Sequence, residues 1–240
     1  IYQFPEIYND QYWWKKDDME FYKNIIPPQS KVLELGSGTG RLAMPLIREN
    51  IDYHGLDISK ELCDFSKRIL NQIDSKKRIY NEDMRDFHLD NKFDYIFIAF
   101  NSFLHILTDD DAIKVFSCVK EHLKDNGKFV LDILVPDPDF LYREEKYREL
   151  PVMDFKDSKT GELIEIFETC KYDVDTEVCD LSWDYRYKDN PSYNKVFDYQ
   201  MRMYYPDTIN RLLIDAGLDI EDRFGAVSYT HLTLPTNREV

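Results

Sequence analysis

Apolar and polar positions along the chain follow two different periods. After residue 30, short runs rich in β-branched and aromatic residues alternate with longer segments of helical spacing, a pattern typical of βα units and a parallel sheet. We predict five strands of that sheet at Lys31–Leu35, Asp52–Leu56, Arg78–Glu82, Phe93–Phe100 and Lys128–Val135. Helices are predicted between them over 41–49, 59–72 and 109–124, with Ser59 and Thr108 as side-chain N-caps.

A second pattern occupies residues 147–204, where apolar and polar positions alternate with a period of two. Three such segments, joined by the turn-rich stretches SKTGE and KDNPS, indicate antiparallel strands of a separate small sheet. Helical spacing predicts an N-terminal cap helix over Asp17–Ile26 and a late helix over Asp207–Gly217, followed by a strand at Leu218–Phe224. The fold class is therefore α/β: a doubly wound, mostly parallel sheet with an inserted antiparallel sheet.

The end of the chain departs from this pattern. Residues 227–236, VSYTHLTLPT, match codon for codon the translation of a transposase adaptor used in sequencing libraries, so we expect 227–240 to be a non-native tail. The alternative is a genuine alternating strand. The start at Ile1 without a methionine also indicates a lost segment.

Composition limits the classes of partner. The 240 residues carry a formal net charge of -15 with a pI of about 4.8, which opposes binding to nucleic acid or to an anionic membrane. No apolar run approaches the roughly 20 residues that span a bilayer, and we expect a cytoplasmic location. Four scattered cysteines lack the CxxC and His spacing of a metal site, so we expect no metal and predict reduced, buried thiols at Cys63, Cys118, Cys170 and Cys179.

A glycine-rich turn follows the first predicted strand. In KVLELGSGTG, residues 31–40, the glycines occupy Gly36, Gly38 and Gly40, where a ligand can approach main chain without meeting a Cβ atom. Asp57 ends the second strand, where a carboxylate can accept hydrogen bonds from ribose hydroxyls, and Asp83 ends the third. The spacing is GxGxG rather than the GxGxxG of dinucleotide folds, and the surrounding acids favour a cationic, phosphate-free nucleoside.

Four motifs in order carry a resemblance to a known family. LELGSGTGR, GLDIS, NEDMRDF and FNSFLHI resemble the motifs of the class I, Rossmann-like S-adenosylmethionine (SAM) methyltransferases. The resemblance covers about residues 1–225 and, with the inserted sheet, is strongest to small bacterial enzymes related to glycine N-methyltransferase and the sugar N,N-dimethyltransferases. It implies a SAM-binding domain over 1–146 and 205–226 and a β lid over 147–204. It also implies a final antiparallel strand after Gly225, so with a non-native tail we expect that strand to be missing and Leu218–Phe224 to lack its natural neighbour.

The resemblance also implies a cofactor site at the rim of the sheet. The three glycines would line the methionine and ribose portions of SAM, and Asp57 would bind the ribose diol. Asp83 and Met84 would contact adenine, and Tyr8, in IYND, would reach the methionine carboxylate. The alternatives are structural: Asp57 is also a plausible helix cap, and Glu34 a hydrogen-bond acceptor for loop amides.

Methyl transfer from a sulfonium depends mainly on holding the acceptor in line with the S–CH3 bond. A base is needed when the acceptor arrives protonated, and histidine has the suitable pKa. We therefore select His105 in FNSFLHI as the candidate base, with Asn101 as a second catalytic residue that binds the SAM amino group or the acceptor. The alternative for His105 is a helix cap or packing beside Phe103.

The aromatic residues between 172 and 205 allow two interpretations. Sheet packing explains most of them. The functional alternative is a lid in which Trp183, Tyr185 or Tyr204 closes over the acceptor and contacts the sulfonium.

The sequence thus predicts SAM-dependent transfer of a methyl group to nitrogen or oxygen of a small molecule by direct in-line displacement. The alternatives are an NAD-dependent oxidoreductase on the same sheet and a SAM-binding module without catalysis. The identity of the acceptor and the oligomeric state stay open.

Overall fold

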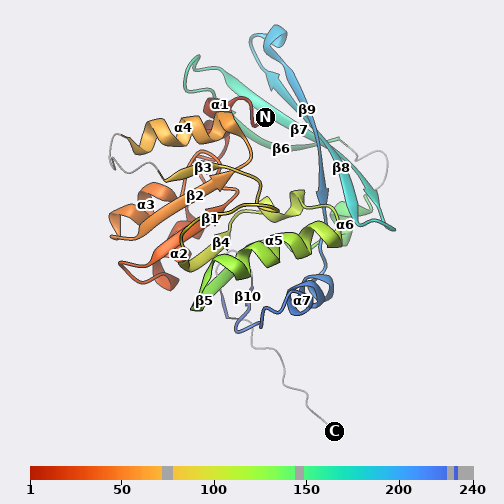
Figure 1. Cartoon of the computed structure of the whole chain (residues 1–240). Coiled ribbons are helices and arrows are strands. Elements are labelled where there is room, and N and C mark those ends of the chain that lie inside the picture. The colour runs from red at the N-terminus through yellow and green to blue at the C-terminus, as the bar shows by residue number, and fades with distance from the viewer. Residues whose placement is uncertain (72–77, 144–148, 226–229, 232–240) are drawn as a thin grey trace.

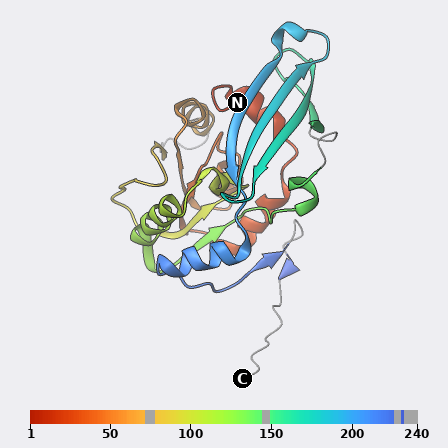
Figure 2. The same cartoon turned by 90° about the vertical axis from the view of Figure 1, so that its right-hand side faces the viewer.

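The computed structural model describes residues 1–71, 78–143, 149–225 and 230–231. It contains a five-stranded parallel sheet and a separate four-stranded antiparallel sheet, seen from two sides in Figures 1 and 2. The predicted α/β class with an inserted antiparallel sheet is confirmed.

Helices and strands alternate along the first half of the chain after two N-terminal helices. The elements are α1 (Pro5–Gln11), α2 (Asp17–Ile25), β1 (Lys31–Leu35), α3 (Ala43–Arg48), β2 (Asp52–Asp57), α4 (Lys60–Leu70), β3 (Ile79–Asn81), β4 (Phe93–Ile98), the 3-10 helix η1 (Ser102–His105), α5 (Asp109–His122) and β5 (Leu123–Leu131). The predicted N-caps are confirmed, since the side chains of Ser59 and Thr108 accept hydrogen bonds from the backbone of α4 and α5.

The second half forms the antiparallel sheet and then returns to the main domain. Its elements are α6 (Pro138–Leu141), β6 (Glu149–Lys156), β7 (Leu163–Asp173), β8 (Val178–Tyr187), η3 (Pro191–Tyr193), β9 (Lys195–Arg202), α7 (Pro206–Asp215), β10 (Phe224–Gly225) and β11 (Thr230–His231).

The order of the parallel sheet, β3-β2-β1-β4-β5, places β1 at its centre. Glu34 of β1 lies opposite Gly55 of β2 on one side and Phe97 of β4 on the other. The chain proceeds from β1 to one edge and then crosses back to β4, so the carboxyl ends of β1 and β4 border the point where the strand order reverses. Open α/β sheets bind their ligands at this point.

Two apolar clusters cover the two faces of the parallel sheet. Leu33 and Leu35 of β1 face the cluster that includes α5 and α7, and Val32 faces the cluster that includes α2, α3 and α4. The near-continuous burial of β1 follows from this two-sided packing. The side chain of Glu34 points to the opposite face from Leu33 and Leu35. Its carboxyl group is therefore buried on the face that α2, α3 and α4 cover.

The antiparallel sheet has the order β6-β7-β8-β9 and packs against α1 and η1. Its strands show the predicted alternation: Ile164, Ile166 and Tyr185 are buried with part of α1, whereas Glu165 and Asp180 point to solvent. One face of this sheet therefore lies against the rim of the main domain and the other is exposed.

Two predictions about strands are wrong. The fifth strand begins at Leu123 rather than Lys128, because the Asn126–Gly127 stretch continues the strand across an irregular register instead of forming a turn. The strand predicted at Leu218–Phe224 is reduced to Phe224–Gly225, which pairs with Thr230–His231 in a separate two-stranded sheet. Most of the tail, 226–229 and 232–240, lies outside the described residues.

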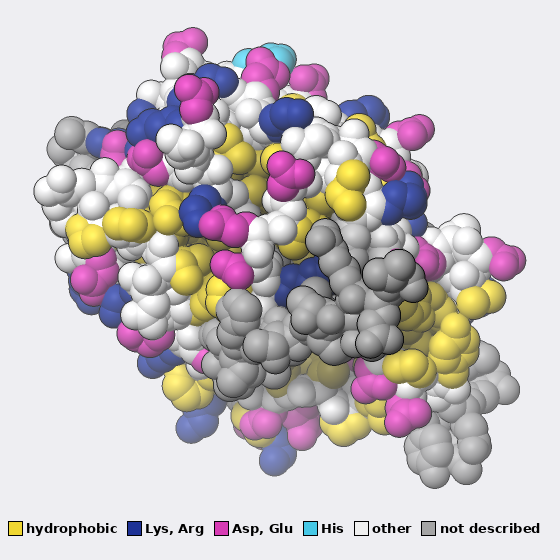
Figure 3. All heavy atoms as spheres, turned by 90° about the horizontal axis from the view of Figure 1, so that it is seen from below, with side chains coloured by type: hydrophobic (Ala, Val, Ile, Leu, Met, Phe, Trp, Pro, Cys, Tyr) yellow, Lys and Arg dark blue, Asp and Glu magenta, His cyan; other side chains and the backbone are white. Residues whose placement is uncertain are grey.

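The surface and the helix lengths add two facts. Figure 3 shows acidic and basic side chains interspersed on one face of the molecule, without a patch of one sign. In the part of the chain that the structure describes, every helix is too short or too polar to cross a bilayer.

Candidate functional site

The glycine loop after β1 runs close to the end of β2. The amides of Gly36 and Ser37 donate to Leu56 O at 2.8 and 3.0 Å. Gly36, Gly38 and Gly40 all have positive φ, 72°, 54° and 78°, a conformation that strains residues with a Cβ atom. A Cβ atom on Gly36 would lie 2.8 Å from Ser102 Cβ and 3.4 Å from Met84 Cε. The loop therefore needs glycine both for its dihedral angles and for its neighbours.

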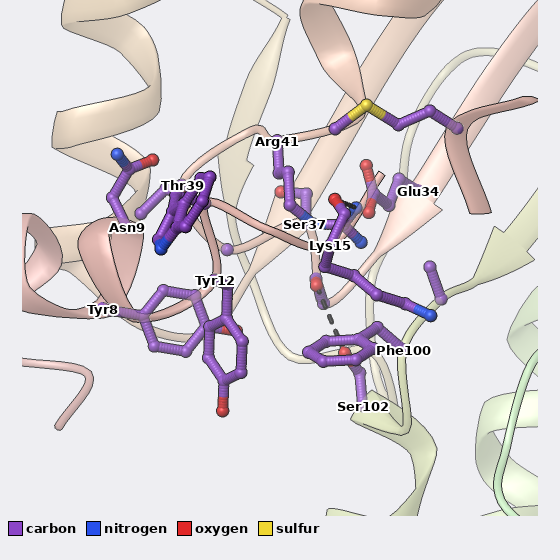
Figure 4. Close-up of a pocket in the computed structure, with 15 residues that line it drawn as sticks. Tyr8, Asn9, Tyr12, Lys15, Glu34, Ser37, Thr39, Arg41, Phe100 and Ser102 are labelled. Carbon is purple, nitrogen blue, oxygen red and sulfur yellow. Dashed lines mark hydrogen bonds between the residues drawn. The ribbon is translucent and has the colours of Figure 1, made fainter. Parts of the chain in front are cut away.

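A cavity lies beside this loop, between the N-terminal segment and the segment after β4 (Figure 4). The hollow measures about 610 Å³, including the part open to solvent. The lining combines aromatic, charged and main-chain groups: Tyr8, Asn9, Tyr12, Trp13, Lys15, Met19, Glu34, Gly36, Ser37, Gly38, Thr39, Arg41, Ala99, Phe100 and Ser102. Of the predicted cofactor residues, Tyr8, Gly36 and Gly38 line it.

Asp57 lies directly behind the loop, at the end of β2. Its Oδ2 accepts from Gly38 N at 2.8 Å and its Oδ1 accepts from Ser59 N at 2.8 Å. The side chain is buried, and this burial raises its pKa despite the two backbone donors. Each carboxylate oxygen keeps a second lone pair, which a ribose diol would use.

Glu34 supplies a buried carboxyl group at the floor of the cavity. It accepts a 2.5 Å hydrogen bond from the Tyr53 hydroxyl. The alternative that Glu34 accepts hydrogen bonds from the amides of the glycine loop is therefore wrong. Burial raises the pKa of Glu34 to about 8, although the Tyr53 hydrogen bond and Arg41 oppose the shift. A cationic group placed beside Glu34 would restore its charge.

Arg41 is a lining residue that the motif analysis did not select. Its guanidinium binds both oxygens of the fully buried Asp18 at 2.7 and 2.6 Å and donates to Lys15 O at 2.9 Å. This bidentate pair ties the glycine loop to the start of α2 and places the Arg41 guanidinium in the wall of the cavity. Its position directly after the third glycine was the available sequence signal. Tyr12 and Phe100, whose rings meet at 5.0 Å, were also not predicted.

Asp83 and Met84, the two residues predicted to contact adenine, have different surroundings. Met84 lies next to Gly36, within reach of a ligand on the loop. Both oxygens of Asp83 bind the Arg85 guanidinium, at 2.6 to 3.1 Å, and Arg85 also reaches Asp111. An adenine amine would therefore have to share the Asp83 carboxylate with Arg85.

Gly40 does not line the cavity. A Cβ atom on it would collide with Ser66 Oγ and lie 3.6 Å from Ala43 Cβ. Ser66 belongs to α4 and is fully buried. The third glycine thus permits the loop to pack against α4, and the ligand contact that the resemblance implied for it stays a prediction.

His105 lies at the end of η1, under the antiparallel sheet and next to the N-terminal segment. Its Nδ1 lies 3.2 Å from Gln200 O and its Nε2 lies 2.7 Å from the Tyr2 hydroxyl. A carbonyl oxygen only accepts, so Nδ1 carries the proton and Nε2 accepts from Tyr2. Burial lowers the pKa of His105, which favours the neutral imidazole with an unprotonated Nε2.

Asn101 has a conformational and bridging role. Its backbone is left-handed, with φ of 65°, and its Oδ1 accepts from Leu134 N at 2.7 Å. The backbone N–H of Asn101 donates to Asp132 O at 3.1 Å. The side-chain oxygen is thus bonded to main chain after β5, which leaves only the NH2 group for a ligand.

The three lid aromatics have different positions. Trp183 donates from Nε1 to Glu168 Oε2 at 2.8 Å, and Tyr185 donates to Gln11 Oε1 at 2.6 Å, both on the buried face of the antiparallel sheet. Tyr204 instead donates to Ile106 O and packs on Phe103 in the core of the main domain. Only the first two rings belong to the face above the site.

Together these groups provide a glycine-walled cavity with a carboxyl floor, a carboxylate at the end of β2 and a neutral imidazole nearby. Residues 32–127 match the family model described as a methyltransferase domain. The fold, with its 3-2-1-4-5 sheet and second antiparallel sheet, is that of solved SAM-dependent methyltransferases. The chain is therefore similar to methyltransferases in the sequence of residues 32–127, and it has the fold of the SAM-dependent class.

Individual relatives agree with this class. A putative methyltransferase, YqeM, of Bacillus subtilis is 28% identical over 111 residues, 45% of this chain and 44% of the relative. The dTDP-3-amino-3,4,6-trideoxy-alpha-D-glucopyranose N,N-dimethyltransferase of Streptomyces venezuelae is 25% identical over 116 residues, 48% and 47% of the two chains. The chain thus spans about half the length of these relatives.

A solved SAM-dependent methyltransferase from Clostridium acetobutylicum superimposes with a TM-score of 0.70. It is 21% identical, and the match covers 91% of this chain and 85% of that one. At this identity the likeness establishes the fold.

The packing of Gly40 predicts a stability difference between two glycines of similar φ. Gly40→Ala should lower the unfolding free energy by about 2–4 kcal/mol, because a left-handed alanine costs about 1–2 kcal/mol and overpacking against Ser66 adds about 1–2 kcal/mol. Gly161→Ala, with φ of 77° and no atom within 4 Å of the new Cβ, should incur the first cost alone. Urea denaturation measures both; equal losses would contradict the packing role, and a Ser66→Ala background should restore part of the difference.

The raised pKa of Glu34 predicts a pH-dependent stability. Between an unfolded pKa near 4.5 and the folded value of about 8, the native state binds more protons at this site, so the unfolding free energy falls as pH rises, by up to about 1.4 kcal/mol per pH unit. Glu34→Gln keeps an acceptor for Tyr53 and removes the titration. The stability of this variant relative to wild type should therefore rise from pH 5 to pH 8 in denaturant titrations, and parallel pH profiles would refute the assignment.

Proposed function

We propose that the chain is a SAM-dependent methyltransferase that methylates a nitrogen or oxygen atom of a small molecule. One observation carries the proposal: the glycine-walled cavity and the buried Asp57 carboxylate lie together at the point where the strand order of the sheet reverses. The family match over 32–127 supports the same activity.

The residues present fit SAM by charge and shape. Gly36 and Gly38 expose main chain, Asp57 offers acceptors to a ribose diol, and Met84 lies beside the loop for an adenine ring. The acidic Glu34 suits an ammonium group, and Arg41 with Lys15 suits a carboxylate. Tyr8, whose ring lies 3.5 Å from the Cβ position of Gly38, would cover the ligand.

SAM supplies an activated methyl group, so the protein mainly positions the acceptor and accepts its proton. His105 Nε2 is the one imidazole nitrogen at this rim whose lone pair faces a hydroxyl, that of Tyr2. An acceptor that replaced the Tyr2 hydroxyl there could pass its proton to His105. Asn101 would contribute its NH2 group at the same rim.

An amine acceptor is favoured over a hydroxyl by the surroundings of His105. The ring centroids of Tyr2 and Tyr199 lie 5.7 and 6.0 Å from that of the imidazole. The ring centroid of Trp183 lies 5.7 Å from that of Tyr199. Aromatic faces attract a cation by their quadrupole. The Streptomyces relative is named as an N,N-dimethyltransferase of an amino sugar, which supports the same preference.

The NAD-dependent alternative fits the loop less well. A dinucleotide places its pyrophosphate on a helix N-terminus after GxGxxG. Here α3 begins only at Ala43, without a side-chain cap, and the carboxyl group of Glu34 faces the cavity. An anionic pyrophosphate would meet that carboxyl group.

Cofactor binding is the direct test. Isothermal titration should show binding of SAM and S-adenosylhomocysteine and none of NAD. Asp57→Asn should weaken S-adenosylhomocysteine about 10–100-fold, because hydrogen bonds to a charged group contribute about 1.5–3 kcal/mol. Asp64→Asn, an exposed α4 aspartate paired with Lys60, is the matched control and should bind as wild type. Binding of NAD, or equal affinity of the two variants, would overturn the assignment.

The base assignment predicts a specific pH profile. His105→Gln should lower kcat about 10²–10⁴-fold and remove the acidic limb of the rate profile, with S-adenosylhomocysteine affinity unchanged. Because burial lowers the pKa of His105, the wild-type rate should fall only below the ordinary histidine value of about 6.5. Formation of S-adenosylhomocysteine over a panel of amines and amino sugars measures it, with the exposed His88→Gln as control. An unchanged profile in His105→Gln would exclude the imidazole as base.

A further inference from the structure

Two cysteines meet on the buried face of the antiparallel sheet. In the β7·β8 register, Cys170 lies opposite Leu181 and Cys179 lies opposite Tyr172, so the two cysteines are diagonal neighbours. Side chains two positions apart point to the same face of a strand. The two Sγ atoms are 3.2 Å apart, about 1.2 Å longer than the 2.0 Å of a disulfide bond.

The surroundings favour thiol chemistry over metal binding. A structural metal site needs three or four ligands, and among the described residues no group of three or more His, Cys, Asp or Glu could hold one. The neighbours of the pair in its cluster are mostly apolar, among them Leu181, Met203 and Tyr199. Both thiols are reduced in this structure.

The two sulfurs differ in reactivity and access. The hydrogen bond between the two thiols lowers the pKa of Cys170, and the Arg143 guanidinium acts in the same direction. The pKa of Cys179 is raised, by the same hydrogen bond and by burial. Cys170 is half-buried, whereas Cys179 has no exposed surface. Cys170 therefore has the thiolate character and access of an attacking sulfur, with Cys179 in place as the resolving thiol.

We propose that Cys170 and Cys179 form a reversible oxidation site that closes to a disulfide with hydrogen peroxide. The Cys170 thiolate attacks one peroxide oxygen, the O–O bond breaks, and a sulfenic acid and hydroxide form. The Cys179 thiol then attacks the sulfenic sulfur, and the S–S bond forms as water leaves. Two thiols are oxidised and one peroxide is reduced to two waters.

The diagonal placement makes this disulfide labile. Diagonal neighbours in an antiparallel pair have Cα atoms about 7–8 Å apart, beyond the roughly 6.8 Å that an unstrained disulfide spans. Closure therefore requires β7 and β8 to shift. Strained disulfides have higher reduction potentials and are readily reduced, as a reversible site requires.

The site lies next to the acceptor side of the molecule. Glu168, two residues before Cys170 on the same face, holds Trp183 Nε1, and Tyr199 of the same cluster lies 6.0 Å from the His105 ring. The glycine loop belongs to the other sheet. A shift of β7 against β8 would thus move the lid aromatics and leave the glycine loop in place.

Peroxide oxidation followed by mass spectrometry tests the proposal without any substrate. The reduced full-length protein is treated with hydrogen peroxide, free thiols are alkylated, and the intact mass is recorded before and after dithiothreitol. We expect a loss of two hydrogen atoms that dithiothreitol reverses. Trypsin cuts after Lys171, the only basic residue between the cysteines, so the disulfide should appear as two linked peptides.

Variants assign the roles of the two sulfurs. Cys170→Ser should abolish the two-hydrogen loss, and Cys179→Ser should stop at one added oxygen on Cys170. Cys118→Ser, which removes a buried thiol in α5, is the matched control and should oxidise as wild type. The proposal is overturned if wild type gives no Cys170–Cys179 cross-link, or if Cys63 or Cys118 reacts first. Because the cross-link is mapped in the wild-type protein, the result stands even where a variant does not fold.

Discussion

One steric constraint organises the rim of the sheet: the main chain that leaves β1 must pass within contact distance of three other segments. Gly36 lies against the start of η1, Gly38 against the Tyr8 ring of α1, and Gly40 against α4. Each glycine has a positive φ, so the loop could not make these approaches with other residues. The cavity, helix α1 and the 3-10 helix that carries His105 are thereby held around one turn.

The electrostatics of the cavity depend on how each acid is buried. Asp57 accepts hydrogen bonds from two backbone N–H groups, and the Arg41 guanidinium binds both carboxylate oxygens of Asp18. Glu34 has only a neutral hydroxyl and a more distant guanidinium, so desolvation dominates and its pKa rises. The floor of the cavity is therefore the place where an incoming positive charge gains most.

The sequence predicted the sheets well because two-sided burial and period-two alternation are local signals. It failed at the start of the fifth strand and at Leu218–Phe224, where pairing with distant strands decides the outcome. Motif spacing located the glycine loop and the end of β2, but it could not tell that Gly40 faces α4. The Arg41–Asp18 pair joins residues 23 positions apart, and no single-chain pattern announces such a contact.

Helix α1 makes exposed polar contacts with α4 on one side and with the turn between β6 and β7 on the other. Glu6 pairs with Arg68 at 3.2 Å, and Asp10 accepts from Ser158 N at 2.8 Å. Exposed contacts of this kind contribute little individually, so the helix is held mainly at its buried end, where Gln11 accepts from the Tyr185 hydroxyl. Because Tyr8 of the same helix lines the cavity, a displacement of the antiparallel sheet at Tyr185 would reach the wall of the cavity through α1.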